Sequence, residues 1–109
     1  MKLIDLIQHL ESEEALLKFY NANNFPTETE AISAFMADSL DIDSDIFFFP
    51  VEETGEYILF EKDGRKYFEL FSLELGVEFY SYFDETFKTG KYTDLQKAKR
   101  LLEYLINDA

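Results

Sequence analysis

The sequence predicts an α+β domain with two N-terminal helices, a four-stranded antiparallel meander and a C-terminal helix packed on the sheet. Three observations lead to this prediction. Apolar residues recur at helical spacing over the first twenty positions, the period changes to that of strands from Ile46, and the end of the chain returns to helical spacing. The length of 109 residues is typical of one domain, which would span 1–109.

Two helices are predicted before the sheet. Ser12, followed by Glu13 and Glu14, resembles a helix start, so the first stretch is either one bent helix or two short ones, ending near 21–26. Thr27 and Glu30 form a capping box that predicts a second helix over 28–40. The apolar positions behind these predictions are Leu3, Ile4, Leu6, Ile7, Leu10, Leu16, Leu17 and Tyr20 for the first, and Ile32, Phe35, Met36 and Leu40 for the second.

Four strands are predicted, the first near 46–52, the second near 56–62 and the fourth near 77–83, joined by turns at 54–55, 63–64 and 73–76 with the third strand between the last two turns. Asp63-Gly64 suits a type I′ turn, which needs positive φ at both central positions. A two-residue turn there sets the cross-strand pairs Lys62 with Arg65, Glu61 with Lys66, Phe60 with Tyr67 and Leu59 with Phe68.

Both faces of this sheet are predicted to be apolar. One carries Phe48, Pro50, Tyr57, Leu59, Phe68 and Leu70, and the other carries Phe47, Phe49, Val51, Ile58, Phe60, Tyr67 and Phe71. Either helices cover both faces, or the strands are out of register, or an aromatic face is left for a partner or a second copy of the chain. Thr93 and Gln96 form another capping box, which predicts the final helix over 94–107.

The composition argues against an enzyme. The chain has no Cys, which excludes a disulfide, a thiolate nucleophile or a cysteine-ligated zinc. Its one histidine, His9, lies on a predicted amphipathic helix, where a structural or surface role is expected. The glycines fall at predicted turns and none begins a phosphate-binding fingerprint. We therefore expect no catalytic residues, no cofactor and no metal.

A cytoplasmic location is expected from two features. Polar residues interrupt the N-terminal apolar stretch, which is unlike a secretory signal. The longest apolar run, 46–51, has six residues, whereas a membrane helix needs about twenty.

Charge is the main indication of function. Residues 1–61 hold fourteen acids against two bases, and residues 62–109 hold nine acids against eight bases. Between Lys18 and Lys62 there are ten acids and no base. Such a surface repels nucleic acid and anionic lipid, and attracts a basic protein. The small basic groups at 62–66 and 97–100 are read as solubility and helix-end features.

An acidic segment runs directly into the phenylalanines. Asp41, Asp43, Asp45 and Glu52 match the acidic positions of a calcium loop, but Ile46 stands where that loop needs glycine, so calcium is not predicted. The interface interpretation makes the carboxylates a charged rim around an apolar centre. Its predicted partner-binding residues are Asp38, Asp41, Asp43, Asp45, Phe47, Phe49, Glu52, Glu53 and Glu56. The alternative is that the phenylalanines are core and the aspartates keep an edge strand soluble.

A cysteine-free, strongly acidic chain of this size without a catalytic constellation resembles the immunity proteins that neutralise bacterial toxins, including nuclease bacteriocins and the toxins of contact-dependent growth inhibition. The resemblance lies in overall character and transfers no residue role. It implies a protein that binds a basic toxin domain, without direct contact to nucleic acid or membrane, and occludes its active surface. Two alternatives stay open: a nucleic-acid mimic that inhibits a DNA-processing enzyme, and an adaptor that homodimerises through the aromatic sheet face.

Overall fold

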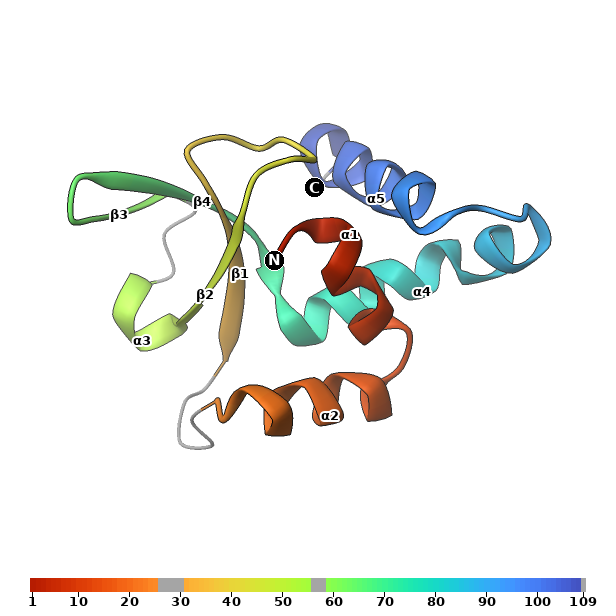
Figure 1. Cartoon of the computed structure of the whole chain (residues 1–109), viewed down its shortest axis with the longest axis horizontal. Coiled ribbons are helices and arrows are strands. Elements are labelled where there is room, and N and C mark those ends of the chain that lie inside the picture. The colour runs from red at the N-terminus through yellow and green to blue at the C-terminus, as the bar shows by residue number, and fades with distance from the viewer. Residues whose placement is uncertain (26–30, 56–58, 109) are drawn as a thin grey trace.

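The computed structural model describes residues 1–25, 31–55 and 59–108, and it confirms the α+β class with a four-stranded antiparallel sheet, N-terminal helices and a C-terminal helix (Figure 1). The longer helices lie on one side of the sheet. The elements in chain order are α1 (Leu3–Leu6), the 3-10 helix η1 (Ile7–Leu10), α2 (Glu13–Asn23), β1 (Ile32–Ala37), β2 (Ile46–Pro50), α3 (Val51–Thr54), β3 (Leu59–Lys62), β4 (Arg65–Ser72), α4 (Leu73–Thr89) and α5 (Asp94–Asp108).

The N-terminal stretch forms short separate helices. Ser12 is extended and its Oγ accepts a hydrogen bond from the Ala15 N–H at 3.0 Å, which caps α2 and separates it from η1. Asn24 ends α2 in the left-handed conformation with φ 53°. The predicted start at Ser12 and the predicted end near 21–26 are both confirmed.

The predicted helix over 28–40 is wrong, because residues 32–37 form β1, a central strand between β2 and β4. All six residues of β1 are buried. A strand covered on both faces reads as a continuous apolar run, which cannot be distinguished from a helix by its period. The capping box of Thr27 and Glu30 lies outside the described residues.

The sheet is not a meander, because its strand order is β2-β1-β4-β3. The strand predicted near 46–52 is β2 and pairs with β1 rather than with β3. Residues 77–83 belong to the helix α4 instead of a fourth strand. The residues of the predicted turn at 54–55 end the short helix α3, with Gly55 at φ 67°.

The β3–β4 hairpin confirms the most specific local prediction. Asp63 and Gly64 have φ of 54° and 79°, as a type I′ turn requires. The four pairs follow the predicted register, from Lys62 opposite Arg65 to Leu59 opposite Phe68.

The core has a helix-side part and a far-face part. Apolar side chains from the helices pack with Ile32, Ala34 and Met36 on the helix side. The opposite face holds a second cluster, the far-face cluster, made of Phe35, Ala37, Phe49 and Tyr67 with the half-buried Phe47 and Phe60. The expectation of two apolar faces is thus confirmed.

A register shift opposite Ala34 and Phe35 corrects one assignment of side chains to faces. Ala34 pairs with Phe71 and Phe35 pairs with Glu69, which leaves Leu70 as the extra residue. Leu70 and Phe71 therefore both pack in the helix-side core. Phe71 had been predicted to lie with Phe60 and Tyr67.

The final helix is confirmed, together with its capping box. The Thr93 N–H donates to Gln96 Oε1 at 2.8 Å, and the Gln96 N–H donates to Thr93 Oγ1 at 3.2 Å. The main contacts of α5 are with α1, η1 and α4, while α4 itself contacts β1 and β4. Within the described ranges, no helix combines the length and apolar character needed to cross a membrane.

Candidate partner-binding surfaces

The acidic loop between β1 and β2, residues 38–45, holds four of the predicted contact residues. Two of its carboxylates are already paired within the chain. Asp38 Oδ2 lies 3.1 Å from Arg65 Nη2, and Asp45 Oδ1 lies 3.3 Å from Lys2 Nζ. Lys2 Nζ also donates to the Asp43 carbonyl at 2.6 Å, which ties the loop to the N-terminus. About half of the charge of this loop is therefore compensated internally.

Asp41 and Asp43 keep their negative charge available. Both are exposed, and the Asp43 N–H donates to Asp41 Oδ1 at 2.9 Å, which shapes the loop as an Asx turn. Neither carboxylate forms an ion pair with a base in the described part of the chain. Nor do any three His, Asp or Glu side chains among the described residues gather closely enough to hold a metal ion.

The remaining predicted acids lie at the other end of β2. Glu52 and Glu53 are on α3, which follows β2 directly, whereas the acidic loop precedes it. Glu53 Oε1 lies 2.6 Å from Lys62 Nζ, and this hydrogen bond raises the pKa of Lys62. Glu56 lies outside the described residues. The structure thus divides the predicted acidic surface into two separate parts.

The two predicted aromatic contacts are largely closed within the chain. Phe49 is 9% exposed, and its ring centroid lies 5.0 Å from that of Tyr67. Phe47 is half-buried, with the Arg65 guanidinium 5.2 Å from its ring centroid. The nearby Lys62 ammonium lies 5.6 Å from the Phe49 centroid. Cationic side chains therefore lie over two rings of the far-face cluster.

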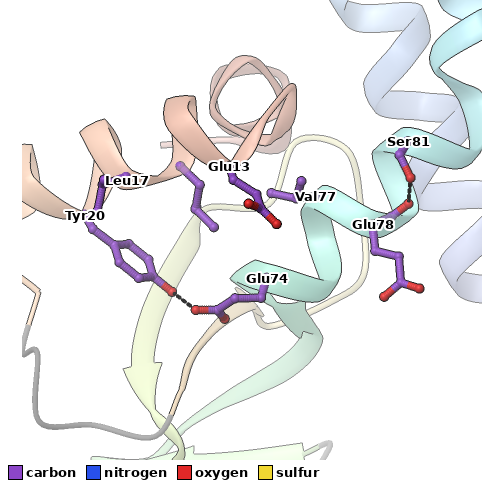
Figure 2. A pocket seen from close by; sticks show the side chains of 8 residues that line it. Glu13, Leu17, Tyr20, Glu74, Val77, Glu78 and Ser81 are labelled. Atoms are coloured by element: carbon purple, nitrogen blue, oxygen red, sulfur yellow. Dashed lines mark hydrogen bonds between the residues drawn. The ribbon is translucent and has the colours of Figure 1, made fainter.

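A groove between α2 and α4 was not predicted from the sequence. It has a volume of about 560 Å³ and is lined by residues of these two helices, which lie side by side (Figures 1 and 2). The lining residues are Glu13, Leu16, Leu17 and Tyr20 from α2, and Glu74, Val77, Glu78 and Ser81 from α4. We refer to it as the α2–α4 groove.

Hydrogen bonds position the polar side chains of the groove. Tyr20 Oη donates to Glu74 Oε1 at 2.8 Å and so links the two helices (Figure 2). Burial and this hydrogen bond raise the pKa of Tyr20 well above its usual range. Ser81 Oγ donates to the Glu78 carbonyl at 2.5 Å, and Tyr82 Oη donates to Glu78 Oε1 at 3.0 Å. The two tyrosine hydroxyls thereby orient the carboxylates of Glu74 and Glu78 along α4.

The sequence prediction contains no helix that could form this side of the groove, because it places residues 77–83 in a strand. Leu73, Val77, Tyr80 and Phe87 recur at helical intervals, and this pattern is the signal that identifies α4 in the sequence. Of these, Leu73, Tyr80 and Phe87 are buried. His9, in contrast, was placed correctly on an N-terminal helix, where it stacks on Phe19 with ring centroids 4.5 Å apart.

Tyr20→Phe is expected to lower the free energy of unfolding by about 0.5–1 kcal/mol near pH 7. Because the folded-state pKa of Tyr20 is raised, this contribution is complete below the unfolded pKa of about 10 and is lost as pH rises through the folded value. Urea denaturation of wild type and variant, from pH 7 to above pH 10, measures this difference in the free energy of unfolding. The control is Tyr92→Phe, which removes a hydroxyl that forms no hydrogen bond within the described residues. A difference that persists undiminished at the highest pH would contradict the linkage.

No protein-family model matches this sequence, and neither a curated protein nor a solved structure is significantly similar to it.

Proposed function

We propose that this protein is an acidic immunity protein that binds a basic toxin domain, of nuclease type, and neutralises it by occluding its active or nucleic-acid-binding surface. The observation that carries the proposal is the distribution of uncompensated charge. The formal net charge is −13, and ion pairs within the chain already occupy Lys2, Lys18, Lys62, Arg65 and Arg100. Carboxylates without such a partner remain exposed in the acidic loop and along the α2–α4 groove.

This charge pattern favours a basic protein over other partners. An uncompensated negative surface attracts a cationic domain and accelerates its diffusional encounter, while it repels nucleic acid. A nuclease domain is itself cationic where it binds its substrate phosphates. An acidic inhibitor therefore complements the surface that it has to block, as the resemblance to bacterial immunity proteins also implies. Such a protein acts in the cytoplasm of the toxin-producing cell.

The burial of the aromatic face disfavours the homodimer alternative. Phe35 is fully buried, and Phe49 and Tyr67 are each 9% exposed within a single chain. A second copy placed on this face would gain little further apolar burial from these rings. The nucleic-acid mimic is disfavoured because the uncompensated carboxylates occur as separate groups, in the acidic loop and along the α2–α4 groove, and because ion pairs neutralise Asp38 and Asp45 within the loop.

The double variant Asp41→Lys/Asp43→Lys is expected to slow association with the toxin by about tenfold or more at low salt, because steering depends on uncompensated charge. The partner is the basic protein that co-purifies with the tagged chain from its source, and surface plasmon resonance measures the on-rate. The control Glu85→Lys/Glu103→Lys makes the same change in net charge on α4 and α5.

Three outcomes separate the possibilities. A selective loss in the loop variant, together with inhibition of the toxin by wild type, supports the proposal. An equal loss in both variants assigns steering to net charge and removes the acidic loop from the interface. Failure to retain any basic protein, or retention without inhibition, overturns the proposed function.

A further inference from the structure

The α2–α4 groove is built from two matching helical stripes. On α2 the lining residues fall at Glu13, Leu16, Leu17 and Tyr20, and on α4 they fall at Glu74, Val77, Glu78 and Ser81. Both sets follow the pattern i, i+3, i+4 and i+7, so each helix presents one face over two turns. At 1.5 Å per residue the groove is about 10 Å long. Its walls therefore suit a third helix of at least two turns.

The groove has an accessible apolar part. Leu17 is 58% exposed, although it is a large aliphatic side chain and its neighbour Leu16 is 6% exposed. Val77 lines the groove from α4, as Leu17 does from α2 (Figure 2). When a ligand covers an exposed leucine in a concave site, the burial of apolar surface lowers the free energy of the complex.

The charges of the groove are of one sign. Its charged lining residues are Glu13, Glu74 and Glu78, and no Lys or Arg is among the described residues that line it. Lys18, the base on α2, points its ammonium to Glu14 at 3.5 Å. Glu74 and Glu78 are one helical turn apart, a spacing that matches two bases at i and i+4 on a facing helix. Charge complementarity therefore requires a cationic occupant.

We propose that the α2–α4 groove is the docking site for a basic amphipathic helix of the partner protein. Apolar side chains of that helix cover Leu17 and Val77, and its Lys or Arg residues pair with Glu13, Glu74 and Glu78. This is the helix-in-groove mode of recognition, with an apolar centre and a charged rim. The inference rests on the proposed function, which identifies the partner as a basic protein. It adds the surface of the chain that binds this partner.

A designed amphipathic helical peptide of leucine and lysine tests the groove without the toxin. Fluorescence anisotropy is expected to show binding to wild type, and at least about tenfold weaker binding to Glu74→Lys/Glu78→Lys, since two attractive pairs become repulsive. The control Glu85→Lys/Glu103→Lys, with the same net charge, is expected to bind like wild type. A peptide with glutamate in place of lysine is expected not to bind.

A second variant protects the test against misfolding, because Glu74 accepts the hydrogen bond of Tyr20. Leu17→Ser removes an exposed side chain, so it is expected to leave the fold intact and to weaken peptide binding. Amide chemical-shift changes induced by the peptide are expected on α2 and α4. Equal binding by all variants, or shifts confined to other elements, would overturn the docking site. So would light scattering in which wild type forms a dimer and Glu74→Lys/Glu78→Lys remains a monomer, because a second copy of the chain would then occupy the groove.

The same variants distinguish failure of the docking site from failure of the proposed function. A toxin that binds wild type and the groove variants equally refutes docking in the groove and leaves the immunity function standing. Peptide binding that depends on the groove, in a protein that inhibits no basic toxin, supports the docking site and refutes the immunity function.

Discussion

Replacing Phe35 by alanine is expected to lower the free energy of unfolding by about 3–5 kcal/mol, a large part of the stability of a domain of this size. Phe35 is fully buried on the central strand β1, on the face away from the long helices. Its ring centroid lies 5.6 Å from that of Phe49 and 6.2 Å from that of Phe60. Removal of the ring leaves a cavity that these neighbours fill only in part.

Urea denaturation monitored by circular dichroism measures this loss. The comparison is Phe60→Ala on the edge strand β3, where the side chain is half-buried and a smaller loss is expected. A loss below about 1 kcal/mol for Phe35→Ala would mean that the far-face cluster rearranges easily, unlike a close-packed core. The far face of the sheet would then again be a candidate surface for partner binding.

Gly76→Ala is expected to destabilise the protein, although alanine is the better helix former by about 1 kcal/mol. Gly76 lies in the first half of α4, where a Cβ would meet Phe71 Cε2 at 2.5 Å and Cδ2 at 2.7 Å. The same Cβ would lie 3.1 Å from Cδ2 of Leu10, on the 3-10 helix η1. Both neighbours are buried, so neither can move into solvent. Overpacking of this kind costs about 1–3 kcal/mol.

Thermal and urea denaturation show whether Gly76→Ala raises or lowers the free energy of unfolding. A double-mutant cycle tests whether the contact with Phe71 is the cause. Gly76→Ala is expected to be better tolerated in a Phe71→Leu background, where the ring edge is gone. Because Gly76 lies between Glu74 and Val77, a displaced α4 is also expected to weaken binding of the leucine–lysine peptide. Stabilisation by Gly76→Ala would show that α4 is not held against Phe71 as the contact distances imply.

Local signals predicted the elements that depend on local interactions. The Ser12 cap, the Asp63-Gly64 turn and the capping box of Thr93 and Gln96 each appear where they were expected. These features involve residues no more than a few positions apart, so the sequence contains both partners of each contact. The hairpin register followed from its turn for the same reason.

Elements whose identity depends on distant partners were misassigned. The residues of β1 read as a helix because both faces of this strand are buried, one in the helix-side core and the other in the far-face cluster, and burial on both faces removes the alternation. Residues 77–83 read as a strand because aromatic residues are typical of strands, whereas α4 uses Tyr80 and Phe87 as helical core positions. With both errors, the order β2-β1-β4-β3 could not be predicted.

The candidate surfaces were likewise predicted only in part from the sequence. Asp41 and Asp43 were identified from charge, yet only the structure shows that Asp38, Asp45 and Glu53 are paired with Arg65, Lys2 and Lys62. The α2–α4 groove joins Tyr20 to Glu74 across 54 positions of the chain.

By itself, the sequence determined the α+β class, the capped helices, the tight hairpin and the large negative charge of this protein. Each of these depends on composition or on neighbours close along the chain. Only the tertiary structure decided which strand is central, which carboxylates remain uncompensated and where the chain is concave. These properties depend on packing between distant segments, where burial and ion pairing are set by residues that no local pattern brings together.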